Sequence, residues 1–137
     1  MDNIELIKSE EIEAGLKETS HLYLTGLLER PNAVDEIHKE YEVGMSYSKK
    51  FRSKEPHCHL ANDEWTYVLE GKLKVLLLDK MKEYEFFEGD FFIIRANTPF
   101  AVKFYKKTKV LFSKYPGGND KVILPTNEKI ERWSKKY

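Results

Sequence analysis

Residues 57–64 read His57-Cys58-His59-Leu60-Ala61-Asn62-Asp63-Glu64 and place three potential metal ligands close together. Successive side chains of a β-strand point to opposite faces, so His57 and His59 would project from the same face. A hairpin after His59 would then turn the chain so that Glu64 faces the two imidazoles. Two imidazole nitrogens and one carboxylate oxygen leave coordination positions open and suit Fe, Mn, Ni, Co or Zn. The simpler alternative is that two surface histidines lie by chance near a turn.

The chain around this stretch predicts many short strands. From Tyr41 onward, β-rich runs alternate with turn signals such as Asn62-Asp63, Glu88-Gly89-Asp90 and Asn97-Thr98-Pro99. Short runs at near-even spacing favour an all-β sandwich or barrel. The candidate strands are residues 41–48, 51–59, 63–70, 72–79, 83–87, 91–95, 100–105 and 109–115.

Both ends of the chain carry a predicted short helix. The first is expected at residues 9–18, with Ser9 as its N-cap. A strand is expected next, at His21–Leu28. The second helix is expected at residues 127–137, with Asn127 as its N-cap.

Strand parity predicts which side chains form a pocket wall. On the strand after the hairpin, Thr66 shares a face with Glu64, whereas Trp65 takes the other face. Phe100 and Val102 share an apolar face on a later strand. We therefore expect the pocket wall to contain Phe100, Thr66 and Val102. Trp65 is expected to pack against the N-terminal strand or a dimer partner.

Two groups of residues together resemble the two motifs of the cupin superfamily. The first motif, H-x-H followed by E and then G, is matched by His57, His59, Glu64 and Gly71. The second begins G-D and passes along an apolar strand to a proline turn, as residues 89–99 do. The resemblance implies an all-β fold, a double-stranded β-helix or jelly-roll barrel, here with a short N-terminal and a short C-terminal helix.

The resemblance also implies how the chain is organised. We expect a single cupin domain over residues 1–137, with the motif core at 41–115. Residues 1–40 would form an N-terminal extension, and residues 116–137 a C-terminal extension.

The sequence departs from the cupin pattern at one metal-ligand position. Phe100 stands where the second motif would supply its last histidine, and no histidine follows His59. One interpretation is a three-ligand site on His57, His59 and Glu64, with Phe100 as an apolar wall. The other is that the metal has been lost and the pocket binds something else.

The resemblance implies a metal-dependent enzyme that acts on a small molecule, with Glu64 as the catalytic carboxylate. Two enzyme classes are equally compatible with the resemblance: an isomerase or lyase acting on a carbohydrate or hydroxycarbonyl compound, and an Fe(II)-type dioxygenase. The fold alone does not determine the reaction. The alternative is a non-catalytic, small-molecule-binding sensor. By analogy with small cupins, a homodimer is expected, through sheet packing or exchange of the strand His21–Leu28.

Several further side chains are candidates for a role in the pocket. Tyr47 could donate a proton, and Arg95 could bind substrate. Arg52 and Lys54 could also attract an anionic substrate. Cys58 lies between the two histidines but is expected to point away from them as a small buried side chain.

Composition narrows the class of protein. The chain of 137 residues has one cysteine and no apolar run near the ~20 residues of a membrane span, which favours a cytoplasmic protein without membrane contact. Its 23 basic and 23 acidic residues balance overall, although residues 1–42 are acidic and residues 103–137 are basic. A nucleic-acid partner is not expected, because no strongly basic domain or binding motif is present.

Overall fold

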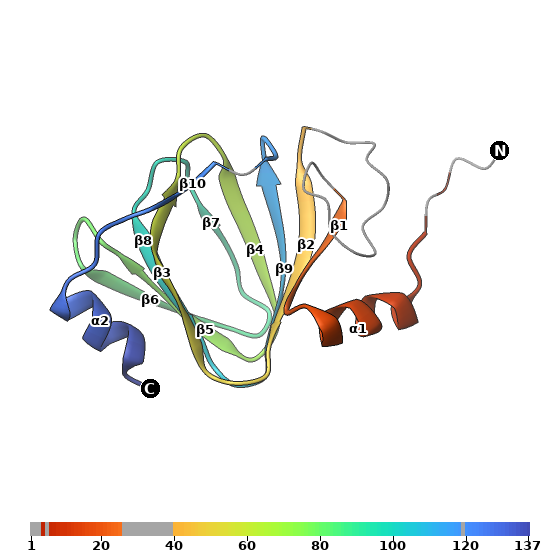
Figure 1. Cartoon of the computed structure of the whole chain (residues 1–137), viewed down its shortest axis with the longest axis horizontal. Helices are drawn as coiled ribbons and strands as arrows, with labels where there is room; N and C mark the ends of the chain where they lie inside the picture. Colours follow the sequence, from red (N-terminus) through yellow and green to blue (C-terminus); the bar gives the residue numbers. More distant parts are fainter. Residues whose placement is uncertain (1–3, 5, 26–39, 119) are drawn as a thin grey trace.

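The computed structural model describes residues 4, 6–25, 40–118 and 120–137, in which ten strands lie between two helices (Figure 1). The helices are α1 (Ser9–Glu18) and α2 (Glu128–Lys135). The strands are β1 (His21–Thr25), β2 (Glu42–Ser48), β3 (Arg52–His59), β4 (Asp63–Glu70), β5 (Lys72–Leu77), β6 (Lys82–Phe87), β7 (Phe91–Ile94), β8 (Phe100–Phe104), β9 (Thr108–Tyr115) and β10 (Lys121–Ile123).

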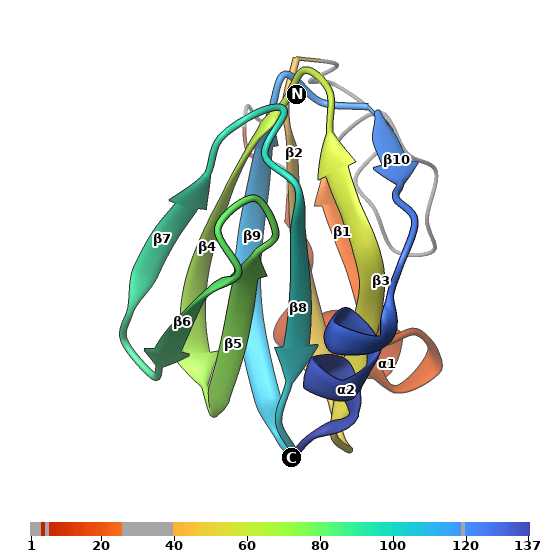
Figure 2. The ribbon, with the colours of Figure 1, turned by 90° about the vertical axis from the view of Figure 1, so that its left-hand side faces the viewer.

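The strands form two five-stranded antiparallel sheets that face each other, as Figure 2 shows. One sheet has the order β1-β2-β9-β4-β7, and the other has the order β10-β3-β8-β5-β6. Strands that follow one another in sequence often lie in opposite sheets, as β3 and β4 do. This arrangement confirms the predicted jelly roll, although the described strands form two separate sheets and no closed barrel.

The predicted strand boundaries agree with β2 to β9 to within a few residues. The strand expected at His21–Leu28 is observed up to Thr25, and residues 26–28 lie outside the described residues. β10 was not predicted, because its three residues are all exposed and show no alternation of polar and apolar side chains. It becomes a strand only by pairing with the edge of β3, where Lys121 lies opposite His59.

The helix at each end packs on the outside of a sheet. The N-cap of α1 is Lys8, which has an extended backbone, and no side chain caps the helix. Ser9 is instead the first helical residue, so the prediction that Ser9 is the N-cap was wrong. Asn127 does cap α2, where its Oδ1 accepts a hydrogen bond of 3.0 Å from the Ile130 amide. α2 is held against β8 by Lys103, whose Nζ donates to the Trp133 carbonyl at 2.7 Å.

Alternating side chains divide each sheet into an inner and an outer face. Val68 on β4 is fully buried between the sheets, and Thr66 also points inward. On the outer face of the same strand, Trp65 and Tyr67 each remain 41% exposed. The predicted parity of β4 is therefore confirmed. The inner faces supply one apolar cluster formed by Val68, Leu73, Val75, Ile94, Phe100, Val102, Phe104 and Val110.

Gly71 makes the tight turn between β4 and β5 possible. Its φ angle is +85°, a region that side chains disfavour, and a Cβ atom there would lie 2.5 Å from Thr108 Oγ1. The Thr108 hydroxyl uses this close approach to donate to the Lys72 carbonyl at 2.8 Å. The turn delivers β5 into the sheet opposite β4. In the part of the chain that the structure describes, no helix is long and apolar enough to cross a membrane.

Candidate functional site

A cavity of about 390 Å³ lies between the inner faces of the two sheets. Its volume lies in the range of small-molecule sites. One part of its wall is apolar and the other carries imidazole, carboxylate, ammonium and guanidinium groups. The lining residues are His21, Tyr23, Ser46, Arg52, Lys54, His57, His59, Glu64, Thr66, Leu73, Val75, Phe92, Ile94, Phe100, Val102, Phe104, Val110, Phe112, Lys114 and Lys121.

His57 is held in one orientation by the backbone of its own strand. Its Nδ1 lies 2.8 Å from the Glu55 carbonyl oxygen, which can only accept, so Nδ1 carries the proton. Burial lowers the pKa of His57 to about 4, against a smaller opposing effect of the Glu55 carbonyl. The ring is therefore neutral near pH 7 and has a lone pair on Nε2.

His59 is oriented by a residue far away in the sequence. Its Nδ1 lies 3.0 Å from Asp120 Oδ1. The Oδ2 atom of Asp120 accepts hydrogen bonds from the backbone amides of Ala61 and Asn62, at 2.7 and 2.9 Å. Burial raises the pKa of Asp120, but these two amides and His59 outweigh it and the pKa is lowered overall. Asp120 is therefore an ionised anchor that ties the end of β3 to the segment before β10.

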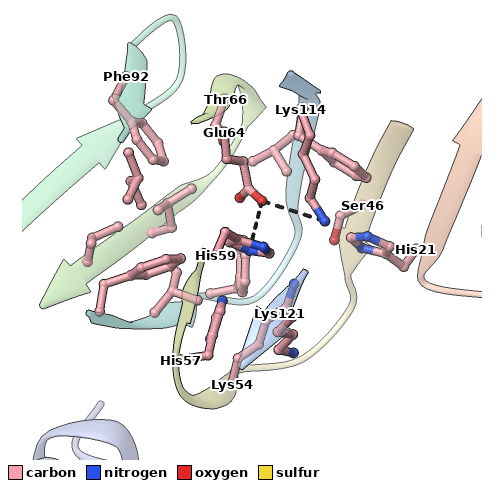
Figure 3. Close-up of a pocket in the computed structure, with 18 of the residues that line it drawn as sticks. His21, Ser46, Lys54, His57, His59, Glu64, Thr66, Phe92, Lys114 and Lys121 are labelled. Atoms are coloured by element: carbon pink, nitrogen blue, oxygen red, sulfur yellow. Dashed lines mark ion pairs between the residues drawn. The ribbon is translucent and has the colours of Figure 1, made fainter. Parts of the chain in front are cut away.

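Glu64 faces His59 across the cavity, as Figure 3 shows. The His59 Nε2 and Glu64 Oε2 atoms lie 3.6 Å apart, and the Lys114 Nζ lies 3.9 Å from the same carboxylate oxygen. With its proton on Nδ1, a neutral His59 would present a lone pair to a carboxylate oxygen. Two acceptors at this distance repel each other unless a positive charge lies between them. The geometry favours either a proton on His59 Nε2 or a bound cation.

The sequence profile of the cupin domain matches residues 44–112, half of the chain. This chain belongs to the cupin family. The matched region contains His57, His59, Glu64 and Phe100, whereas the cavity is also lined by residues outside that region, among them His21 and Lys121. No curated protein matches the chain in sequence.

Solved structures share the cupin fold at low sequence identity. A protein with a double-stranded β-helix domain from Klebsiella pneumoniae has a TM-score of 0.63 and 9% identity over 92% of this chain and 100% of its own. Streptomyces Pac13, a nucleoside dehydratase, has a TM-score of 0.58 and 12% identity over 71% of this chain and 78% of its own. The polyketide cyclase RemF from Streptomyces resistomycificus has a TM-score of 0.58 and 19% identity over 79% of this chain and 72% of its own. At these identities the likeness concerns the fold.

The donor chemistry of this cupin cavity fits a divalent metal ion. His57 and His59 have their Nδ1 atoms engaged by an oxygen, which leaves Nε2 as the metal-binding nitrogen and is the usual outer-shell arrangement of metal-binding histidines. The side chains are not assembled as a finished centre, because no group of three described His, Cys, Asp or Glu residues is positioned to hold a metal ion. The residues that would hold it are His57, His59 and Glu64.

The predicted wall residues all line the cavity of the cupin. Phe100 packs against His57, with ring centroids 4.4 Å apart, and lies 6.4 Å from His59. Thr66 and Val102 line the cavity from β4 and β8. At the position where the motif would supply a histidine, the cupin therefore has an aromatic wall against the imidazoles.

Two other predicted residues lie away from the cavity. Ser46 on β2 points into it, so its neighbour Tyr47 points to the opposite face, beside α1. Arg95 follows β7 with a side chain 72% exposed, and its Nη1 lies 3.3 Å from Asp63 Oδ2. The prediction that Tyr47 and Arg95 bind substrate finds no support in their positions.

Sequence reasoning missed several polar residues of the cavity. His21 and Tyr23 enter from β1, where His21 stacks on Phe112 with centroids 4.6 Å apart. Lys114 enters from β9, and Lys121 from the unpredicted β10. The parity of β1 and β9 could have indicated His21 and Lys114 once Ser46 was known to point inward. Asp120 had no local signal, since its partner His59 lies 61 residues away.

Proposed function

We propose that this cupin is an isomerase or lyase that acts on a hydroxycarbonyl compound such as a carbohydrate. A divalent metal ion would be held by His57, His59 and Glu64. The single observation that carries the proposal is the close approach of His59 Nε2 and Glu64 Oε2, 3.6 Å apart inside a small-molecule cavity. A metal ion would stabilise both acceptors there. When bound, it would polarise the carbonyl oxygen of the substrate.

The chain's own residues would then handle the proton. Glu64 is the one carboxylate among the cavity-lining residues, and it would accept the proton from the carbon beside the carbonyl. Lys114, whose Nζ lies 3.9 Å from Glu64 Oε2, would orient the carboxylate and compensate its charge. Phe100 and Val102 would exclude water from the reacting carbon. Proton transfer at carbon is a step that isomerases and lyases share.

The experiment is proton exchange in D₂O, followed by NMR, on a panel of sugars and hydroxy acids. The purified protein is loaded in turn with Fe(II), Mn(II), Ni(II), Co(II) or Zn(II). We expect deuterium to enter one carbon position, and the Glu64→Gln variant to lose about 10²-fold or more of this rate. Arg95→Gln, on an exposed residue outside the cavity, is the matched control and should exchange at the wild-type rate. Exchange that is absent with every metal, or equal in Glu64→Gln, would overturn the proposal.

The aromatic side chain of Phe100 favours a second candidate, a non-catalytic small-molecule sensor. Phe100 covers the His57 ring at 4.4 Å and removes the last histidine of the motif. A sensor would bind a compound from the same panel without deuterium exchange or product. Oxygen uptake with Fe(II) and a panel compound would instead indicate the dioxygenase interpretation.

We propose further that two copies of the chain form a homodimer through the outer face of β4 and β7. This face carries Trp65, Tyr67, Phe91 and Ile93, which are 41, 41, 58 and 38% exposed. Trp65 cannot reach the N-terminal strand, because β9 and β2 lie between β4 and β1. An apolar face needs an apolar complement, and a second copy supplies the same face across a two-fold axis. A cytoplasmic location stays a prediction from the single, free cysteine.

A further inference from the structure

The cavity carries an excess of positive charge that the chain as a whole does not have. Among the lining residues, Arg52, Lys54, Lys114 and Lys121 are cationic, and Glu64 is the one carboxylate. The full chain has 23 basic and 23 acidic residues. The excess is therefore gathered at this site, from strands β3, β9 and β10, by the fold.

Three of these cations have no carboxylate partner within the described residues. The Arg52 guanidinium donates to two neutral hydroxyls, Ser48 Oγ at 2.6 Å and Ser46 Oγ at 2.9 Å. The side chains of Lys54 and Lys121 form no hydrogen bond or ion pair with any residue that the structure describes, and the Lys54 ammonium lies 5.4 Å from the centre of the Phe104 ring. Among these four cations, Lys114 alone forms an ion pair with a described carboxylate, that of Glu64, which it shares with His59.

These charges are close enough to affect one another. Burial lowers the pKa of Lys54 to about 8; Glu64 opposes this, whereas Arg52, Lys121 and Lys114 lower the pKa further. Figure 3 shows Lys54 and Lys121 on the His57 side of the cavity. Arg52 and Lys54 are partly buried, whereas Lys121 lies at the exposed edge of the cavity. Partly buried cations without a counter-charge destabilise a fold, since their desolvation is not repaid by an ion pair. A site that keeps them is poised to receive an anion.

The apolar part of the cavity wall restricts the chemistry of the remainder of an anionic ligand. Apart from the polar groups, the wall is formed by aliphatic and aromatic side chains from β5, β7, β8 and β9, among them Val75, Ile94 and Val110. A ligand that fills about 390 Å³ would thus carry an anionic group at one end and a less polar body.

We infer that Arg52, Lys54 and Lys121 form an anion subsite that binds a carboxylate or phosphate group of the ligand, next to the reacting group at His57, His59 and Glu64. The inference rests on the proposed function in one respect only. If the substrate is a hydroxycarbonyl compound, the subsite requires that this compound be an anion. Arg52 offers a fork of donors for two oxygens, and the lysines add point charges from two different strands.

The test uses metal-free protein, titrated separately with inorganic phosphate and with butyrate at pH 7 by isothermal calorimetry. We expect saturable binding of at least one anion, and a loss of tenfold or more in affinity in each of Lys54→Met and Lys121→Met. Binding of phosphate alone or butyrate alone identifies the group. Lys82→Met, on the exposed side of β6, is the matched control and should bind as the wild type does.

Two results would overturn the anion subsite. One is no saturable binding of either anion, and the other is an affinity in Lys54→Met and Lys121→Met equal to that of Lys82→Met. Thermal unfolding of each variant shows whether it is folded, and Lys121 lies on the exposed β10, where its replacement leaves the core intact. The anion titration uses metal-free protein, so its result does not depend on whether the protein binds a metal ion. In the same way, a failure of anion binding would leave the proposed metal site untouched.

Discussion

His59 Nδ1 and Asp120 Oδ1 lie 3.0 Å apart, although the two residues are separated by 61 positions in the sequence. Asp120 also accepts the amide protons of Ala61 and Asn62, so one carboxylate holds both the imidazole and the start of the hairpin that leads to Glu64. The position of two proposed ligands therefore depends on a residue outside the strands that carry them.

Replacement of Asp120 tests this dependence. Asp120→Asn is expected to reduce the affinity for Mn(II) or Zn(II) by about 10–100-fold, because the ligand histidine loses its charged outer-shell partner. Calorimetric titration measures the affinity, and Asp79→Asn, on an exposed turn, is the control. An Asp120→Asn protein that is folded and binds metal as tightly as the wild type would contradict the role of Asp120.

Phe100 allows a gain-of-function experiment. Its ring centroid lies 4.4 Å from that of His57, so a histidine there would present a third imidazole to the same space. We expect Phe100→His to raise the metal affinity by about tenfold or more, an effect of the size seen for changes around metal ligands. Phe100→Leu removes the aromatic ring without adding a ligand and should not show the gain. Equal affinities in the two variants would place Phe100 away from any metal.

Lys54 predicts an unusual dependence of stability on pH. Below pH 8 its ammonium is charged in both states, and enclosure of the charge destabilises the folded protein. Between the lowered pKa of about 8 and the ordinary 10.5, the folded state has released the proton while the unfolded state still binds it. The contribution of Lys54 to the free energy of unfolding therefore rises with pH across this interval.

The measurement compares wild type and Lys54→Met in urea at pH values from 7 to 10.5. Lys54→Met is expected to be the more stable protein at pH 7, by on the order of 2 kcal/mol once solvent reaching the ammonium through the cavity is allowed for. This advantage should shrink as the pH rises. A difference that stays constant with pH would show that Lys54 titrates as an ordinary surface lysine.

Much of the fold followed from local patterns. Alternation along residues 63–70 predicted both the inward face with Glu64 and Thr66 and the outward face with Trp65, because strand parity is a property of the backbone. The turn at Gly71 was equally local. The position of Tyr47 outside the cavity did not follow from the sequence, because the parity of β2 is set by which face the opposite sheet covers, and that is a tertiary property.

The cationic side of the cavity could not be predicted in the same way. Lys114 and Lys121 come from strands at the end of the chain, and their relation to His57 and Glu64 arises only when β9 pairs with β4 and β10 pairs with β3. A lysine in a strand looks like a solvated surface residue until the pairing is known. Asp120 belongs to the same class, because its partners are fixed by tertiary contacts.

The exposed face of β4 and β7 predicts a change of oligomeric state. Trp65→Lys is expected to convert a homodimer into a monomer, since it places a charge in an apolar contact that would otherwise be buried. Light scattering coupled to gel filtration measures the mass. Tyr84→Lys, a similarly exposed aromatic residue on β6 in the other sheet, is the control. A wild-type protein that is monomeric at all concentrations would contradict the proposed dimer.

The proposed binding of a divalent metal ion by His57, His59 and Glu64 can be measured through metal content together with metal-dependent stability. Elemental analysis of the protein purified without chelator should find one Fe, Mn, Ni, Co or Zn ion per chain. Addition of that metal to the stripped protein at about 100 times its Kd should stabilise the fold by about 2.7 kcal/mol, and the His57→Ala variant should show neither effect. A wild type without metal, whose thermal stability matches that of His57→Ala after each metal is added, would contradict the proposed metal binding.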